Sequence, residues 1–276
     1  MTQTRIRRSI VLVAGILAFV AVSASASTAI WGGTTDYMGY YVDPASGATL
    51  PAPGGILTFG ASPSPQGGSV LVTTLLNLWK VPVLTAGSPE FLGTYSTVGI
   101  IDLAFDAGNG TLYGIADFPW SSGLYTIDYN CFDFFCRPTP LGVGMPGVQG
   151  IALGPGGIYG AEIGGGLWLL DPKTLQLTFI GNTFVDGITD LAYDPLTHSL
   201  IAASVGMKCY PSPNHCGTES GMIWSIDPLT AQSVLLNGNA PPIYGLAELT
   251  PEPGSVVLFT TGAVGLLAVI RRRLVD

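Results

Sequence analysis

The 276-residue sequence predicts an all-β fold, and two observations carry that prediction. Short runs of apolar, β-branched and aromatic residues alternate with turns rich in Gly, Pro, Asn and Asp, as in strands joined by tight turns. The same four-strand pattern then recurs with start-to-start spacings of 48, 40 and 55 residues. Four strands in each unit of that length indicate the blades of a β-propeller. No useful stretch of helical periodicity lies between the two tails.

The first strand of each unit is the clearest part of the repeat. An apolar residue followed by Ala recurs in one frame at residues 102–106 (DLAFD), 150–154 (GIALG), 190–194 (DLAYD) and 245–249 (GLAEL). Second strands are predicted at residues 111–115, 158–161 and 199–203. Third strands, each ending in Asp, follow at residues 124–128, 167–171 and 223–227. Short fourth runs close two units at residues 140–142 and 179–181.

The repeat extends toward the N-terminus less clearly. Four strands of a further blade are expected at residues 56–59, 69–73, 76–81 and 90–93. Before them, residues 29–31 and 39–44 match strands two and three of another blade whose first strand is missing. The run at 245–249 is a first strand with no partner after it, so joining the two closes a ring. That closure predicts five blades, with six as the alternative, and a β-sandwich with accidental similarity remains the rival fold.

Residues 27–250 therefore form one predicted domain that resembles the β-propeller proteins of the broad class with NHL and quinoprotein-like repeats. The resemblance implies architecture and is nearly silent on activity, because propellers serve as binders and as enzymes. Two marks of particular propeller families are missing, since there is no Trp-Asp pair at the blade ends and no tandem Trp docking motif.

The predicted domain is strongly acidic. The whole chain has a net charge of −8, but six of its ten basic residues lie in the two tails. The four that remain are Lys80, Arg137, Lys173 and Lys208. Against sixteen carboxylates they leave the domain near −12. A field of that sign repels nucleic acid and anionic lipid surfaces, so neither is an expected partner of the propeller.

A signal peptide is predicted at residues 1–26. Three arginines at positions 5, 7 and 8 precede an uncharged apolar run at 10–22, and small residues follow. This order is typical of a secretory signal, and the apolar run is short for a membrane span. Ala24 and Ala26 fit the two small-residue sites before a cut, which places cleavage after Ala26. An uncleaved N-terminal anchor is the alternative.

The C-terminal tail, residues 251–276, has three parts. Pro251, Glu252 and Pro253 precede an uncharged apolar stretch at 254–270, and Arg271, Arg272 and Arg273 follow it. Seventeen residues reach the lower end of membrane-spanning length, so 254–270 is a predicted transmembrane helix. The three arginines are expected to stay cytoplasmic, which leaves the propeller outside.

That three-part order resembles the PEP-CTERM sorting signal of exported proteins in Gram-negative bacteria. The resemblance implies processing near Pro-Glu-Pro by an exosortase-type enzyme, and a link to biofilm and exopolysaccharide production. It implies transient anchoring in the inner membrane, followed by transfer to the cell surface or extracellular matrix. A plain tail anchor that is never cut is the alternative.

Four cysteines form two close pairs, Cys131 with Cys136 and Cys209 with Cys216. An even count in an exported protein favours disulfide bonds, and local pairing is the simplest of three connectivities. A metal site is the alternative, since His215 precedes Cys216, but zinc sites usually space cysteines more tightly. We therefore expect two disulfide bonds and no bound metal.

Asp102 and Asp190 are the candidate channel ligands. Both begin a first strand, and that strand lines the central channel of a propeller, where two carboxylates could bind a cation or act as acid and base. The equivalent positions are Gly150 and Gly245, which leaves a sparse ring and favours structural turn or capping roles. The Asp-Pro pairs that recur at strand ends are interpreted as turn chemistry.

No catalytic residue or cofactor is predicted. His198 lies in a predicted turn and His215 in a cysteine loop, and neither has a nucleophile beside it. Motifs of serine hydrolases, P-loop proteins and zinc proteases are missing. Five loop aromatics are candidates for stacking on sugar rings, with packing under their own loops as the favoured alternative: Trp120, Phe132, Phe134, Phe135 and Tyr210.

Two function classes follow. The first is an exported surface or matrix protein whose non-catalytic propeller binds exopolysaccharide or another surface protein. The second is an extracellular propeller enzyme that hydrolyses or lyses glycans with channel carboxylates. The sequence offers few candidate catalytic residues, and this favours the first class.

Overall fold

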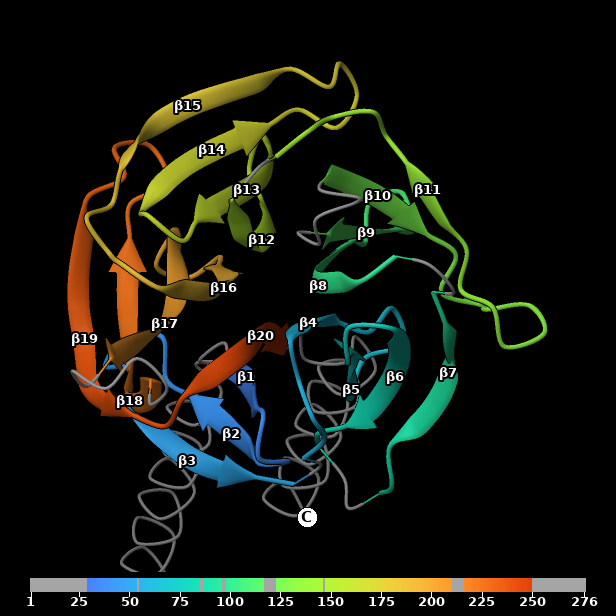
Figure 1. Cartoon of the computed structure of the whole chain (residues 1–276), viewed down its shortest axis with the longest axis horizontal. Coiled ribbons are helices and arrows are strands. Elements are labelled where there is room, and N and C mark those ends of the chain that lie inside the picture. The colour runs from blue at the N-terminus through green and yellow to red at the C-terminus, as the bar shows by residue number, and fades with distance from the viewer. Residues whose placement is uncertain are drawn as a thin grey trace, which may run out of the picture.

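The protein is a five-bladed β-propeller, seen down its axis in the computed structural model (Figure 1). The structure describes residues 29–53, 55–84, 87–95, 98–116, 123–145, 147–209 and 216–249, and the side chains of all of these except 207–209 and 216–220. In that part of the chain, twenty strands form five antiparallel sheets of four. Five blades, the first of the two predicted counts, is confirmed, and the sandwich alternative is wrong.

The strands run from the axis outward in each blade. Blade 1 has β20 (Ile243–Leu249), β1 (Ala29–Thr34), β2 (Gly39–Val42) and β3 (Thr49–Ala52). Blade 2 has β4 (Gly60–Pro63), β5 (Ser69–Thr73), β6 (Asn77–Pro82) and β7 (Glu90–Thr94). Blade 3 has β8 (Ile100–Asp106), β9 (Thr111–Ala116), β10 (Gly123–Ile127) and β11 (Pro138–Pro140). Blade 4 has β12 (Val148–Gly154), β13 (Gly157–Glu162), β14 (Gly166–Leu170) and β15 (Leu177–Asn182). Blade 5 has β16 (Ile188–Asp194), β17 (Ser199–Cys209), β18 (Cys216–Ile226) and β19 (Ser233–Ala240).

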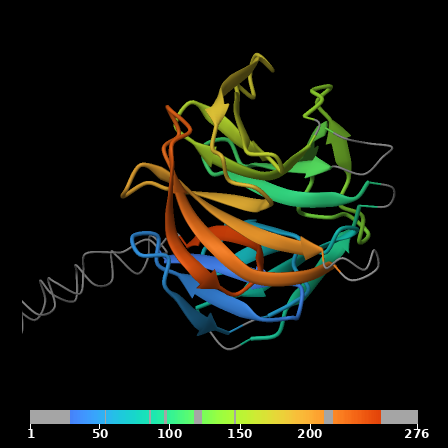
Figure 2. The same cartoon turned by 60° about the vertical axis from the view of Figure 1, so that its left-hand side comes forward.

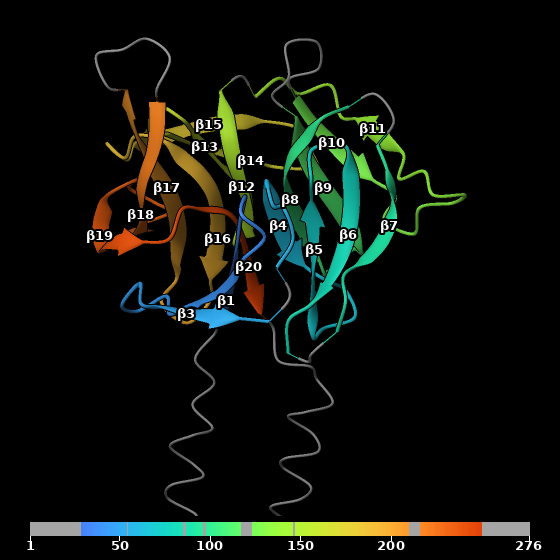
Figure 3. The same ribbon diagram turned by 60° about the horizontal axis from the view of Figure 1, so that its bottom comes forward.

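The ring closes as predicted, through strands from the two ends of the domain. β20 pairs antiparallel with β1, with Ala29 opposite Leu249 and Trp31 opposite Ala247. Figure 3 shows β1 and β20 lying against each other in blade 1. The last strand of the domain is thus the innermost strand of the first blade, and this pairing closes the ring.

Two predicted strands need correction, and two strands, β3 and β19, were not predicted. Residues 56–59 are not a strand, because the inner strand of blade 2 is β4 at Gly60–Pro63. There Ala61 and Ser62 occupy the places of Leu103 and Ala104, so the repeat loses its large apolar residue and is hard to recognise. The outer strand of blade 3 is Pro138–Pro140 rather than 140–142.

The core is divided into five layers, one between each pair of neighbouring blades. The repeated apolar–Ala pair explains this division, because successive strand residues face opposite sides of a sheet. Leu103 packs in the layer shared with blade 2, and Ala104 in the layer shared with blade 4. Leu191 and Ala192 divide in the same way between blades 4 and 1. Figure 2 shows how strongly blade 5 twists between its inner strand and its rim.

A β-bulge recurs just before the repeat in the inner strands. The register of β8 skips Ile101 before Asp102, and that of β16 skips Thr189 before Asp190. The same shift precedes Gly150 in β12 and Gly245 in β20. A bulge re-aims the next side chain, so these four residues face the axis instead of a neighbouring blade.

The Asp-Pro pairs form turns. Asp171 accepts a hydrogen bond from the amide of Lys173 at 2.8 Å, and Asp227 accepts one from the amide of Leu229 at 2.8 Å. Such Asx turns stabilise the hairpins. Among the described residues, no helix is long and apolar enough to cross a membrane.

Candidate functional site: an axial funnel

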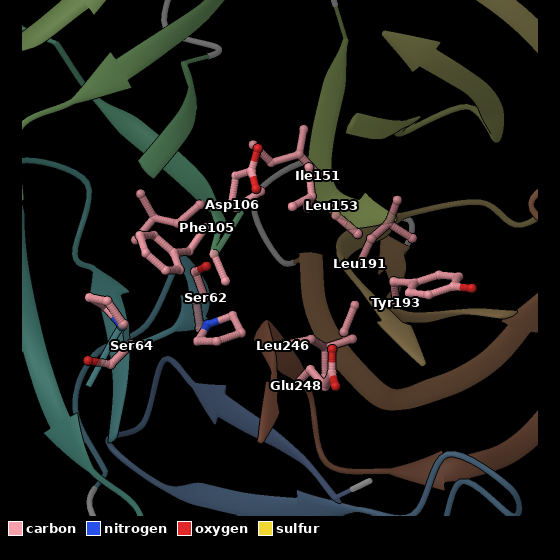
Figure 4. A pocket seen from close by; sticks show the side chains of 18 of the residues that line it. Ser62, Ser64, Phe105, Asp106, Ile151, Leu153, Leu191, Tyr193, Leu246 and Glu248 are labelled. Atoms are coloured by element: carbon pink, nitrogen blue, oxygen red, sulfur yellow. The ribbon is translucent and has the colours of Figure 1, made fainter. Parts of the chain in front are cut away.

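A cavity of about 530 Å³ opens at one end of the propeller axis (Figure 4). Its walls are the C-terminal halves of the five inner strands, together with the turns that follow β4 and β8. We call this cavity the axial funnel. Its volume lies in the range typical of small-molecule sites.

One position of the repeat determines the character of the funnel wall. Each inner strand contributes the residue that follows its apolar–Ala pair, or the Ala-Ser pair of β4. These five residues all line the funnel: Pro63, Phe105, Leu153, Tyr193 and Glu248. The position has a different residue in every blade, whereas the pair before it is nearly constant. Residues of the constant pair build the layers between blades and also line the funnel. The variable residue gives each side of the wall its own chemistry, although Phe105, Leu153 and Tyr193 also pack against those layers.

Asp102 and Asp190 directly precede the lining residues Leu103 and Leu191, and both aspartates are fully buried. Asp102 accepts hydrogen bonds from the amides of Leu103 at 2.6 Å and Ile151 at 2.5 Å, and from the amide of Ala61. Asp190 accepts from the amides of Leu191 and Leu246. Together the two side chains bind one amide from each of the five blades, so they hold the ring together at its axis.

The two buried carboxyl groups also interact with each other, and this interaction couples their titration. Burial raises the pKa of Asp102 to about 8, and hydrogen bonds from Asp190 and the backbone amides limit that rise. Burial and the charge of Asp102 raise the pKa of Asp190 well above its usual range. Two like charges this close cannot both ionise, so the pair retains a shared proton at neutral pH.

Glycine occupies the other three axial positions because the backbones of neighbouring inner strands approach closely there, and at Gly245 the side chain of Thr58 does so as well. A Cβ atom on Gly60 would lie 2.3 Å from the Cα of Asp102, and one on Gly150 would lie 2.7 Å from the Cα of Asp190. A Cβ on Gly245 would lie 3.0 Å from the carbonyl carbon of Gly60. The ring of two Asp and three Gly residues at the axis is thus closely packed, and we call it the packed plug. Its two aspartate side chains accept hydrogen bonds from amides of all five blades.

The funnel itself has two carboxylates on opposite sides, Asp106 and Glu248 (Figure 4). Partial burial, and then the negative charge of nearby Asp194, raise the pKa of Glu248 to about 7. Asp194 is fully buried and accepts hydrogen bonds from the amides of Leu196 and Thr197. Glu248 is therefore protonated in a large fraction of molecules at neutral pH.

Aromatic and hydroxyl groups complete the wall. Phe105 packs edge-on against Tyr129, with ring centroids 5.7 Å apart. The hydroxyl of Tyr193 lies 3.3 Å from Nδ1 of His198. Ser62 lines the funnel, is 1% exposed, and has a hydroxyl without a hydrogen-bond partner. These groups offer apolar ring faces beside acceptors and donors, a combination suited to a polyhydroxylated ligand.

The candidate channel ligands meet at the axis, but they do not face open solvent. Their acceptor atoms already bind backbone amides, so neither Asp102 nor Asp190 presents a free oxygen to a cation or substrate. Among the described residues, no group of three or more His, Cys, Asp and Glu side chains is placed to hold a metal ion.

The first predicted disulfide is confirmed, because Cys131 and Cys136 are bonded. Their loop pairs with β7, where the amide of Thr94 donates to the carbonyl of Phe134. The backbone register places Cys209 opposite Cys216, but their side chains lie outside the described part of the chain. The cleavage residues Ala24 and Ala26, and the sorting residues 251–253 and 271–273, also lie outside it, as do Trp120, Tyr210 and His215.

The loop aromatics at the disulfide are exposed rather than packed under their own loop. Phe132, Phe134 and Phe135 are 69%, 67% and 52% exposed, which contradicts the favoured interpretation from sequence. Phe134 stacks on Phe91 of blade 2 with ring centroids 6.2 Å apart. These rings lie on an outer blade edge and contribute nothing to the funnel.

The funnel residues were missed by reasoning from sequence. Aligning the repeats singled out what they share, and therefore Asp102 and Asp190. The position at which the repeats differ was the available signal. In a propeller, the same inner-strand position from every blade meets at the axis, so a variable position there marks a ligand site.

We call Asp102 and Asp190 the axial pair. Their raised pKa values predict that the protein loses stability as pH rises. Both pKa values are higher in the folded than in the unfolded chain, where Asp titrates near 3.8. The folded state therefore binds more protons between about pH 4 and pH 8. Across that window the free energy of unfolding should fall by up to about 1.4 kcal/mol per pH unit.

Urea unfolding curves across this window measure the effect. Glu248 acts in the same direction, since its pKa is also raised, so Glu248→Gln serves to subtract its share. Asp102→Asn should flatten the remaining slope, because Asn does not titrate. If the free energy of unfolding falls with pH at the same rate in the wild type and in Asp102→Asn, the axial pair is not the cause of the pH dependence.

Comparison with known proteins supports the fold. No protein-family model matches the chain, and no curated protein matches it. A chain from the crystal structure of a nidogen/laminin complex superposes with a TM-score of 0.52 at 11% identity, over 81% of this chain and 98% of that chain. The Myxococcus xanthus glutaminyl cyclase covers 84% of this chain and 78% of its own length, at 14% identity and a TM-score of 0.42. At such identities the first likeness indicates the fold alone, and the second is too weak to carry an argument.

Proposed function

We propose that this chain is an exported bacterial surface or matrix protein whose axial funnel binds a saccharide unit of an exopolysaccharide without cleaving it. The funnel wall is the observation that carries the proposal. Phe105 and Tyr193 offer apolar ring faces, while Ser62 and Glu248 offer polar groups beside them. A sugar ring has matching apolar faces and a rim of hydroxyl groups, so it can use both kinds of contact at once.

Export and sorting complete the proposal, and the position of the chain ends supports it. Ala29 and Leu249 lie opposite each other, and the residue before Leu249 lines the funnel. The proposed span begins at Gly254, so the intact tail would hold the funnel mouth within about 17 Å of the membrane. Removal of the tail by an exosortase-type enzyme would then give a polymer free access to the funnel. Terminal sequencing and intact mass of surface-recovered protein test this, and uncut termini would refute it.

Removal of the aromatic wall should abolish most glycan binding. A glycan array with residues 27–250, which contain all twenty strands, should identify bound saccharides. Phe105→Ala and Tyr193→Ala should each weaken binding by about tenfold or more, since burying an aromatic ring contributes at least 1.5 kcal/mol, or roughly tenfold. Titration calorimetry with the best array ligand measures the loss.

The matched control for this experiment is Phe179→Ala. Phe179 is 53% exposed on β15, where it packs against Trp168 far from the axis. Its removal should leave binding unchanged, and thermal unfolding should confirm that all three variants are folded. If the array shows no ligand, or if Phe179→Ala weakens binding as much as the two funnel variants do, the proposal is wrong.

A glycan-cleaving enzyme is the second candidate, and one observation favours it. Glu248 has a pKa near neutrality, which suits a general acid, and Asp106 provides a second carboxylate across the funnel. Mass spectrometry of oligosaccharides incubated with the protein decides between the two candidates. Cleavage products that vanish in Glu248→Gln would establish the enzyme, whereas unchanged oligosaccharide supports binding alone.

A further inference from the structure

The charge of the axial funnel has one sign. Asp106 and Glu248 line the funnel, and none of the described residues that line it is Lys, Arg or His. Lys80 is the nearest exception, since its ammonium bonds the side-chain oxygen of the lining residue Gln66. Carboxylates in a concave site with apolar walls concentrate a negative potential there.

A second observation in the funnel points independently to a ligand. The hydroxyl of Ser62 is buried and has no hydrogen-bond partner, although buried polar groups nearly always have one. The other four blades have Ala at this position: Ala104, Ala152, Ala192 and Ala247. Ser62 adds a hydroxyl group to the methyl carbon that the other blades have, and a buried hydroxyl without a partner costs free energy. It gains a function if a ligand in the funnel supplies the missing partner.

The aromatic wall is compatible with a cation. Phe105 and Tyr193 line the funnel together with the two carboxylates (Figure 4). An ammonium group is attracted to the face of an aromatic ring as well as to a carboxylate. The same wall that packs against a sugar ring therefore also favours a positive charge on that sugar.

We propose that the ligand of the axial funnel is a saccharide that carries free primary amines, held as ammonium ions by Asp106 and Glu248 on the two sides of the funnel. This inference rests on the proposed function and specifies the class of sugar. A neutral or acidic sugar would leave the two carboxylates without a counter-charge, whereas an amino sugar supplies the ammonium and offers hydroxyl groups to Ser62. The broad, hydroxyl-lined cavity fits a sugar ring better than the narrow side chain of a lysine from a protein partner.

Binding of the ligand should release a proton from the carboxyl group of Glu248. The charge of Asp194 acts on Glu248, and Glu248 in turn raises the pKa of Tyr193, which lies on β16 beside Asp194. His198 lies beside the Tyr193 hydroxyl, and Asp106 lines the same funnel. The described side chains of β1 and β4, which pack beside β20, include no charged group. An ammonium beside Glu248 lowers its pKa, so near neutral pH the ligand should displace protons from this carboxyl group.

The experiment compares glucosamine oligomers with N-acetylglucosamine oligomers of equal length, by calorimetry on residues 27–250 near neutral pH. We expect the free amine to bind about tenfold tighter at low salt, and the preference to shrink at high salt because the ion pairs are screened. Glu248→Gln and Asp106→Asn should each reduce the preference several-fold. Glu90→Gln, an exposed carboxylate on β7, should leave it unchanged.

Buffers of different ionisation enthalpy measure the proton release, which Glu248→Gln should abolish. Equal affinity for both oligomers, untouched by Glu248→Gln and Asp106→Asn, would overturn this inference and leave the proposed saccharide site intact. If neither these oligomers nor any array glycan binds, the proposed function itself fails. Competition by an oligolysine peptide as strong as that by glucosamine oligomers would overturn the inference in favour of a protein partner.

Discussion

Asp102→Leu is expected to yield no folded propeller. The substitution keeps the side-chain size but removes the acceptor for three buried amides, those of Ala61, Leu103 and Ile151. A buried donor left without a partner costs about 1–3 kcal/mol. Three of them cost an amount comparable with the whole stability of a typical domain, about 5–15 kcal/mol. Soluble yield and circular dichroism measure the result.

Two controls separate this effect from a general cost of substitution. Asp106→Leu makes the same change on the same strand, where Asp106 is half-buried at the funnel and caps its own turn, so this variant should fold. Asp102→Asn keeps one acceptor oxygen and can donate to Asp190, so it should fold with a loss of about 1–3 kcal/mol. A stable, cooperative Asp102→Leu variant would show that the two carboxyl groups do not hold the blades together.

Gly150→Ala should produce the second large loss of stability. The added methyl group would lie 2.7 Å from the Cα of Asp190 and 2.9 Å from the amide nitrogen of Leu191. Both atoms belong to backbone of the neighbouring blade, so no side-chain rotation relieves the clash. Overpacking typically costs about 1–3 kcal/mol, and we expect the upper end because a closed ring cannot widen at one blade alone.

Gly164→Ala is the matched control in the same blade. A Cβ atom there has no neighbour within 4 Å, so the free energy of unfolding should change by less than about 0.5 kcal/mol. Urea unfolding at one pH compares the two variants with the wild type. Equal unfolding midpoints for Gly150→Ala and Gly164→Ala would mean that the axial ring accommodates an added methyl group, contrary to the close packing described above.

Most of the architecture was predictable from the sequence because strands and turns depend on short-range patterns. Alternating apolar runs and Asp-Pro or Gly-rich turns marked blades 3 and 4 and three strands of blade 5, and the unpaired first strand at 245–249 predicted the closure with β1. Prediction failed where a blade departs from the pattern. In β4, Ala61 and Ser62 replace the Leu-Ala pair. The strand was therefore predicted at residues 56–59, whereas it lies at Gly60–Pro63.

The site needed the folded chain, because its parts meet only when five strands converge. The bulge before Asp102 and Asp190 turns them toward the axis, and nothing in the local sequence distinguishes a bulged strand from a regular one. Their pKa values depend on burial and on each other, across 88 residues of sequence. Glu248 acquires its role from Asp106 and Phe105, which belong to another blade. The positions of the strands are thus determined by residues that are neighbours in sequence. The axial aspartates and the funnel come together only through packing of distant segments around one axis.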